Sequence, residues 1–348
     1  MPVRVWLRKP LVRGTVASVA GVVFVLIVWR VLGRPVAWNA IQLGALPLTL
    51  AVTGAVVFLT ARAWRFTMLL AYRGRPGAVA GVTGIGWGAG LLLPGPSGDV
   101  AFVGAARRVL GVTIARSSGA AVIARLFDLA SIALVAALAA GISATDEPSD
   151  VIILSAAIAA GAVLLLATLL LRGPRRAVLR VVARLPRVGR LAERAEAAMA
   201  ELSRPHLAAA LAGSTALCRI ATAVQYAGLM SMVGLHLGFW QTWFALSIRT
   251  LLFTVPIQGI AGIGTSQAWW TSALVLQGLP LGAAVSASVT LQALDLAISL
   301  PIAALCSLLA LRARASVWRG RRVAPAREAA ATPFAQRAVP QPQQIDGR

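Results

Sequence analysis

Long apolar stretches, separated by short polar or basic segments, run through most of the chain. They predict full transmembrane helices at about 14–32, 44–62, 117–142, 151–171, 207–234 and 282–311. Each stretch approaches the roughly 20 residues that an α-helix needs to cross a hydrocarbon core of about 30 Å. The pattern therefore predicts an all-α, polytopic membrane protein with about six full transmembrane helices.

Two further apolar segments, 77–110 and 239–279, are interrupted by proline and glycine. Proline removes a backbone donor and glycine weakens a helix, so freed backbone groups need partners that lipid cannot supply. We therefore predict a re-entrant helical hairpin in each segment, entered from opposite sides of the membrane. The residues expected to form the backbone of the breaks are Pro94 and Gly98 in the first hairpin and Pro256, Gly259, Gly262 and Gly264 in the second.

The two broken segments begin parallel series of features, which indicates an internal repeat. Asp99 is followed 29 residues later by Asp128, and Gln267 is followed 28 residues later by Asp295. The odd number of full spans predicted between the hairpins reverses the second unit, so the repeat is inverted. Paired broken helices in inverted halves indicate a transporter-type site near the membrane midplane, where the positive ends of half-helices favour anions.

Composition and charge fit the same picture. The 348 residues are 58% apolar and 13% charged, with a mean hydropathy of +0.80, which leaves too little polar surface for a water-soluble fold. The net charge of +22 comes from basic residues that lie between apolar spans. This distribution fits the positive-inside rule, and it argues against nucleic acid as a partner.

The charge rule also predicts the topology. Residues 1–13, the basic loop 172–206 and a tail at 313–348 are expected to be cytoplasmic, around a single transmembrane domain at 14–312. The loop pattern is typical of an amphipathic helix on the inner leaflet, and the tail has too few apolar residues to fold alone, so we expect it to be disordered. We predict a bacterial inner-membrane protein with both termini in the cytoplasm.

Several ionisable or polar residues fall inside the predicted membrane segments, where a central charge costs at least ~2.5–3.5 kcal/mol. An ion pair between Asp128 and Arg125, three residues apart on one helix, and contact of either with substrate are both open. Asp99 either caps the second arm of its hairpin or faces the substrate. The candidate substrate-binding residues are Asp99, Arg125, Asp128, Arg219, Arg249, Gln267 and Asp295.

Arg219 and Arg249 have no acidic neighbour in sequence and are the preferred partners of an anionic substrate, although either could bind Asp295 or loop carbonyls. No catalytic motif, metal-ligand spacing or cofactor motif stands out. His206 and His236 lack a zinc spacing, and the two cysteines fall inside apolar spans. We therefore expect no enzyme activity, no metal and no cofactor.

The ordered motifs "RAWRFTMLL", "LLLPGPSGD", "ARLFDLA" and "VPIQGIAGIGTSQ" resemble the lysylphosphatidylglycerol synthase transmembrane-region family of flippase-like membrane proteins. The resemblance covers most of residues 10–312. It implies the lipid-translocating half of the two-domain enzymes that make and flip aminoacylated phosphatidylglycerol. We expect this chain not to make that lipid, since it has no room for the soluble aminoacyl-transfer half.

The chain departs from the family pattern at three positions. Pro94, Gly98 and Asp99 match the first loop motif, but Pro96 and Phe102 stand where arginine is common. In the second motif Pro256, Gly262 and Gly264 match, and Gln267 replaces the usual glutamate.

The leading hypothesis is a flippase or transporter of an anionic lipid or lipid-linked molecule, in which Arg125, Arg219 and Arg249 neutralise the headgroup. Two alternatives stay open. One is a non-transporting scaffold that partners an envelope-biosynthesis or lipid-modifying enzyme. The other is an intramembrane lipid-phosphate transferase. The expected partners are membrane lipids with anionic headgroups.

Overall fold

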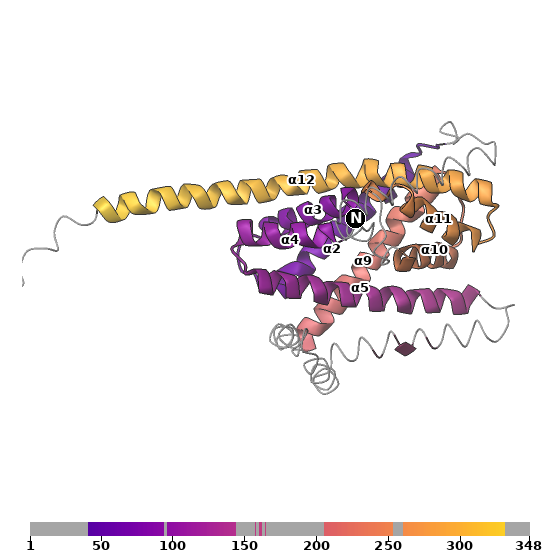
Figure 1. The fold of residues 1–348 in the computed structure, drawn as a ribbon, viewed down its shortest axis with the longest axis horizontal. Helices are drawn as coiled ribbons and strands as arrows, with labels where there is room; N and C mark the ends of the chain where they lie inside the picture. The colour runs from indigo at the N-terminus through magenta and orange to yellow at the C-terminus, as the bar shows by residue number, and fades with distance from the viewer. Residues whose placement is uncertain are drawn as a thin grey trace, which may run out of the picture.

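The computed structural model describes residues 41–93, 96–143, 205–252 and 260–330, together with residues 157, 160, 161 and 164. Every regular element in these ranges is a helix, as Figure 1 shows. The elements are α2 (Ala45–Leu69), α3 (Pro76–Leu92), α4 (Ser97–Ala105), the π-helix η3 (Ala106–Leu110), α5 (Ile114–Ser143), α9 (Pro205–Met232), α10 (Phe239–Leu252), the 3₁₀ turn η5 (Ile260–Gly262), α11 (Thr265–Val275) and α12 (Leu281–Ala330).

Four of these helices are long and apolar enough to span a membrane within the described ranges. They are Ala45–Leu69, Ile114–Ala139, His206–Met232 and Leu281–Arg312. The predicted spans at 14–32 and 151–171 and most of the basic loop 172–206 lie outside the described residues, apart from four isolated positions in the second span. The chain is thus an all-α, multi-pass membrane protein.

α2 and α9 form an antiparallel pair at the centre of the bundle. The Gln42 backbone N–H donates to the Met232 carbonyl at one end of the pair, and Arg65 reaches Thr215 near the other. Glycines allow the two backbones to approach closely, because a Cβ on Gly54 would lie 2.5 Å from the Gln225 nitrogen. Small residues at such contacts are a general device of membrane helices, which pack without a hydrophobic driving force.

The two predicted hairpins are present as helix pairs, α3 with α4 and α10 with α11. In the first, the Ser97 hydroxyl donates to the Leu93 carbonyl at 2.9 Å, which satisfies one carbonyl at the end of α3. Gly98 packs directly on α3, since a Cβ there would lie 2.7 Å from the Gly86 carbonyl oxygen. Pro94, Pro256 and Gly259 lie outside the described residues.

Each hairpin packs on the long helix that follows the other hairpin. We call the part that contains α3, α4 and α5 the first half, and the part that contains α10, α11 and α12 the second half. α3 of the first half packs on α12 of the second, and α10 of the second half packs on α5 of the first. α5 and α12 run in opposite directions across the bundle, as the colours in Figure 1 show. This exchange of partners is the arrangement that the predicted inverted repeat requires.

The hairpins lie at opposite ends of the central pair. The second hairpin belongs to an apolar cluster that contains Ala51 and Trp270, whereas the first belongs to one that contains Phe66 and Phe102. Ala51 and Phe66 are separated along α2 by about 22 Å at 1.5 Å per residue. The two hairpins therefore approach the middle of the bundle from opposite ends.

The structure differs from the sequence prediction at the start of the tail. Disorder is predicted from residue 313, but α12 continues as a single helix to Ala330 and projects beyond the bundle in Figure 1. Extending an existing helix avoids the cost of nucleation, and this segment is rich in alanine and arginine, which are good helix formers. Residues 331–348 lie outside the described ranges.

Candidate functional site

Asp128 joins α5 to both helices of the central pair, α2 and α9. The Arg65 guanidinium of α2 donates to both Asp128 carboxylate oxygens, at 2.8 and 3.0 Å, in a bidentate ion pair. Arg219 of α9 donates to Oδ1 of the same carboxylate at 3.1 Å. The side chain of Arg65 is 2% exposed and that of Asp128 is 14% exposed, so this interaction is largely shielded from solvent. We call these three residues the Asp128 clamp.

Sequence reasoning missed Arg65, because this residue lies beyond the predicted end of the second transmembrane helix. The hydrophobic pattern predicts that the second helix ends near residue 62, whereas α2 continues to Leu69 and keeps Arg65 inside the bundle. The signal that could have found it is Asp128 itself, since a carboxylate amid apolar residues requires a cation from another helix. The clamp also assigns Arg219 to Asp128, so Arg219 is not reserved for a substrate.

Arg125 pairs with Asp99 instead of with Asp128, its neighbour one helical turn along α5. Arg125 Nε and a terminal nitrogen donate to the Asp99 carboxylate of α4 at 3.1 and 3.5 Å. Asp128 points instead toward α2 and α9, where Arg65 and Arg219 bind it. The predicted ion pair between Arg125 and Asp128 is therefore wrong, because each of the two residues pairs with other partners.

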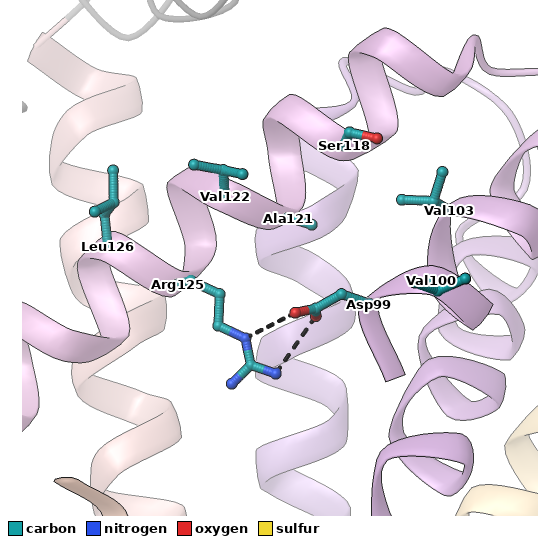
Figure 2. Close-up of a pocket in the computed structure, with 8 residues that line it drawn as sticks. All are labelled: Asp99, Val100, Val103, Ser118, Ala121, Val122, Arg125 and Leu126. Atoms are coloured by element: carbon teal, nitrogen blue, oxygen red, sulfur yellow. Dashed lines mark hydrogen bonds and ion pairs between the residues drawn. The ribbon is translucent and has the colours of Figure 1, made fainter. Parts of the chain in front are cut away.

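A pocket of about 360 Å³ opens between α4 and α5 at this ion pair, as Figure 2 shows. The Asp99 carboxylate and the Arg125 guanidinium are the charged groups among the residues that line it. The other lining residues are Val100, Val103, Ser118, Ala121, Val122 and Leu126. The pocket thus combines one polar end with apolar walls, and its volume is within the ordinary range for small-ligand sites.

Arg62 adds a further cation beside this pocket. It lies one turn before Arg65 on α2, and it interacts electrostatically with Arg125, Arg65, Asp128 and Asp99. Its guanidinium lies 5.8 Å from the ring centres of both Phe58 and Phe66. Within the described part of the chain Arg62 forms no ion pair with a carboxylate, and its Nε is buried without a hydrogen-bond partner.

Together these side chains form what we call the arginine cluster: Arg62, Arg65, Arg125 and Arg219, with Asp99 and Asp128. The cluster has four guanidinium groups and two carboxylates, and hence two more cations than anions among the described residues. Excess positive charge within a membrane bundle is costly unless an anion or water accompanies it. The arrangement is therefore suited to an anionic ligand.

Asp295 occupies the position in the second half that corresponds to Asp128, and uncharged groups donate hydrogen bonds to it. Its carboxylate accepts hydrogen bonds from Gln225 at 2.9 Å, from the Tyr226 hydroxyl at 2.8 Å and from Ser299 at 2.8 Å. Both aspartates thus fasten their helix to α9, one through arginines and the other through uncharged donors. The two aspartates therefore differ in the charge of the groups that donate to them.

Gln292 corresponds to Arg125 and holds the second hairpin. It accepts a hydrogen bond from the Ser266 hydroxyl and donates to the Ala261 carbonyl at 3.0 Å. Gln267 accepts from the Gly264 backbone N–H and so caps α11. Gly262 and Gly264 have φ of +69° and +82°, conformations that glycine adopts without the penalty of a Cβ. The predicted glycines therefore serve the turn before α11.

A prediction follows for the second hairpin. Gln292→Leu is expected to destabilise the protein by roughly 1–3 kcal/mol, because the Ser266 hydroxyl and the Ala261 carbonyl lose their partner in a buried place. Unfolding in mixed micelles with increasing denaturing detergent measures this change. Thr290→Val is the matched control, because the Thr290 hydroxyl donates to the Ser286 carbonyl of its own helix. Equal stability of the two variants would contradict the assigned role of Gln292.

Arg249 of α10 lies next to Tyr226, which donates to Asp295, the residue that the sequence leaves open as a partner of Arg249. Its guanidinium lies 5.7 Å from the Tyr226 ring centre and 5.5 Å from that of Trp270, in cation–π geometry. It therefore belongs to the second half, next to the Tyr226–Asp295 hydrogen bond. The structure brings Asp99, Arg125, Asp128 and Arg219 together, and it places Arg249, Gln267 and Asp295 in the other half.

Comparison with known proteins gives one result. The family model described as "Lysylphosphatidylglycerol synthase TM region" matches residues 15–303 of the chain. No curated protein and no solved structure gave a significant match. The matched range contains the central pair, both hairpins and every residue of the arginine cluster. The chain belongs to the lysylphosphatidylglycerol synthase transmembrane-region family.

Proposed function

We propose that this protein binds an anionic lipid or lipid-linked molecule and moves it across the membrane. The observation that carries the proposal is the pocket between α4 and α5, which has Arg125 at its polar end and apolar walls. The excess cations of the arginine cluster favour a negatively charged headgroup. The valine and leucine side chains favour the hydrocarbon part of the same molecule. An amphiphilic molecule matches both the charged end and the apolar walls of the pocket.

The position of the pocket supports a lipid over a water-soluble anion. Val100 and Val122, on its two walls, are 68% and 50% exposed, and each lies on a helix of the membrane domain. A ligand in the pocket would therefore reach its apolar surroundings directly from the side. The Arg125 side chain is 56% exposed and accessible from the same side. An acyl chain is then able to stay outside the pocket while the headgroup is bound.

The inverted arrangement of the hairpins supports movement in addition to binding. Two broken elements that approach the middle from opposite ends are the common plan of transporters, in which access alternates between the two sides. We place the protein in a bacterial inner membrane with both termini in the cytoplasm, on the basis of the arginine-rich segments. Its required partners are anionic membrane lipids, and the proposed role is that of a carrier and not of an enzyme.

Arg125→Gln tests the proposal. In proteoliposomes with fluorescent phosphatidylglycerol, we expect the initial translocation rate to fall by about tenfold or more, because a hydrogen bond to a charged group contributes ~1.5–3 kcal/mol. Arg312→Gln is the matched control. It removes the same charge from an exposed position at the C-terminal end of the membrane-spanning part of α12, and Arg312 does not line the pocket. Equal rates for Arg125→Gln and the parent protein would reject the proposed site.

A further inference from the structure

The ion pairs of the arginine cluster differ in how firmly they are held. The Asp128 clamp is mostly buried and joins helices of the central bundle. The Arg125–Asp99 pair is exposed, with 56% of the Arg125 side chain and 26% of the Asp99 side chain accessible. Exposed ion pairs contribute little to stability because water and salt compete for both partners. Arg125 is therefore the guanidinium of the cluster that a ligand can most readily take over.

The Arg125–Asp99 ion pair connects the first hairpin to the helix that follows it. Asp99 lies on α4, the returning arm of the first hairpin, and Arg125 lies on α5. Their hydrogen bonds therefore tie the hairpin arm to its neighbouring helix beside the pocket, as Figure 2 shows. An anion that binds Arg125 in place of Asp99 would release this tie.

Arg62 provides a second guanidinium group for an anion that has displaced Asp99. It interacts electrostatically with Arg125, with Asp128 and more weakly with Asp99, and among the described residues it forms no ion pair with a carboxylate. Arg125 is thus the guanidinium that pairs with the hairpin carboxylate, and Arg62 is a nearby guanidinium without an ion pair in the described part of the chain. A phosphate carries more acceptor oxygens than a carboxylate and can bind both guanidinium groups together.

In the second half, the residue that corresponds to Arg125 is the uncharged Gln292. Gln292 holds its hairpin through neutral hydrogen bonds to Ser266 and Ala261. Ser266 and Gln292 are both buried, so these bonds are shielded from an aqueous anion. Among the described residues, an anion has no charged pair to exchange with at this position. Within the described part of the chain, an exposed ion pair that holds a hairpin is therefore a feature of the first hairpin.

We propose that Asp99 is an internal substitute for the substrate's phosphate. Without a ligand Asp99 neutralises Arg125 and ties α4 to α5. A lipid phosphate displaces it, is held between Arg125 and Arg62, and so frees the first hairpin to move. This inference rests on the proposed function, because it names the group that the same pocket binds and the contact that binding breaks.

The first test measures affinity. Purified protein in a neutral detergent is titrated calorimetrically with dihexanoyl phosphatidylglycerol, with dihexanoyl phosphatidylcholine and with inorganic phosphate. Asp99→Asn is expected to bind phosphatidylglycerol about twofold to fivefold more tightly than the parent, the factor that corresponds to loss of an exposed competing ion pair. Ser97→Ala is the control on the same helix turn, and its affinity should equal that of the parent.

The outcomes separate the two proposals. If Asp99→Asn binds as weakly as the parent, or more weakly, Asp99 does not compete with the ligand and the inference is overturned. If the parent binds no phosphatidylglycerol, or binds it equally with and without Arg125, the proposed function itself fails. Tight binding of inorganic phosphate would identify a free anion, and not a lipid headgroup, as the ligand that displaces Asp99.

The second test measures movement. Spin labels at Gly104→Cys on α4 and Val122→Cys on α5, in a Cys218→Ala, Cys306→Ala background, report the distance across the pocket. A Cβ at Gly104 meets no neighbour within 4 Å, so a label there is tolerated. Saturating phosphatidylglycerol should lengthen or broaden this distance distribution. Val56→Cys with Ile220→Cys, both exposed on the central pair, should show no change. An unchanged distance between α4 and α5 would refute release of the hairpin.

Discussion

Replacing Asp128 with alanine is expected to destabilise the protein by about 3–5 kcal/mol, the usual cost of removing one partner from a buried ion pair. The substitution leaves Arg65 and Arg219 close together without their shared carboxylate. Three helices, α2, α5 and α9, lose their common polar contact. Detergent-induced unfolding followed by tryptophan fluorescence measures the loss, and most of the protein should be unfolded where the parent is native.

Two comparisons distinguish this expectation from a general sensitivity to mutation. Asp99→Ala removes an exposed carboxylate and is expected to cost less than about 1 kcal/mol. The triple variant Arg65→Met, Asp128→Leu, Arg219→Met replaces all buried charges of the clamp with apolar groups, and it should recover much of the lost stability. If Asp128→Ala were as stable as Asp99→Ala, the clamp would not hold the bundle together.

Gly54→Leu is expected to separate the central pair and prevent stable folding. Even a Cβ at this position would lie 2.5 Å from the Gln225 nitrogen and 2.6 Å from the Ala221 carbonyl oxygen. These are backbone atoms, so no side-chain rotation can relieve the clash, and overpacking of this kind costs at least ~1–3 kcal/mol. The same displacement would pull Gln225 away from Asp295. Yield of monodisperse protein after extraction, together with its unfolding midpoint, measures the effect.

Gly213→Ala provides the matched control on α9. A Cβ at Gly213 meets nothing within 4 Å, and alanine is the better helix former by roughly 0.5–1 kcal/mol. This variant should be as stable as the parent or slightly more stable. A similar loss of stability in Gly54→Leu and Gly213→Ala would show that the close approach of α2 and α9 is not what the bundle requires.

Much of the fold can be predicted because its signals are local. Proline and glycine interruptions mark both hairpins, and hydrophobic runs of the right length mark the spans. The inverted repeat is visible in the spacing of Asp99 to Asp128 and of Gln267 to Asp295. In the structure each hairpin is connected to the helix that follows it, through Arg125 in the first half and Gln292 in the second.

The pairing of charges could not be predicted, because it depends on which helices are neighbours. Arg125 and Asp128 are three residues apart, yet α5 directs them to different partners on α4, α2 and α9. The sequence alone indicates only a topological role for Arg65, because its acidic partner Asp128 lies 63 residues away. The tail differs from its prediction for another reason, since composition describes an isolated segment and α12 extends from a helix already formed.

The asymmetry between the halves favours the first half as the one that binds the proposed anion. Both halves fasten a hairpin and a long helix to the central pair, but the first does so with arginines and the second with amide and hydroxyl groups. The first half is therefore expected to bind the anion, and the second to provide the rigid frame. Substitutions at Arg125 or Arg62 should alter ligand binding, whereas Gln292→Leu should act through stability.

The most direct measurement is the identity of the lipids that stay bound to the purified protein. Parent protein and the Arg62→Gln, Arg125→Gln double variant are purified from the same cells in a neutral detergent, and bound lipids are quantified by class with mass spectrometry. We predict that anionic lipids are enriched on the parent over the membrane extract, and that the enrichment disappears in the double variant. Lipids in membrane proportions on the parent, or equal enrichment on both proteins, would contradict anion binding by the arginine cluster.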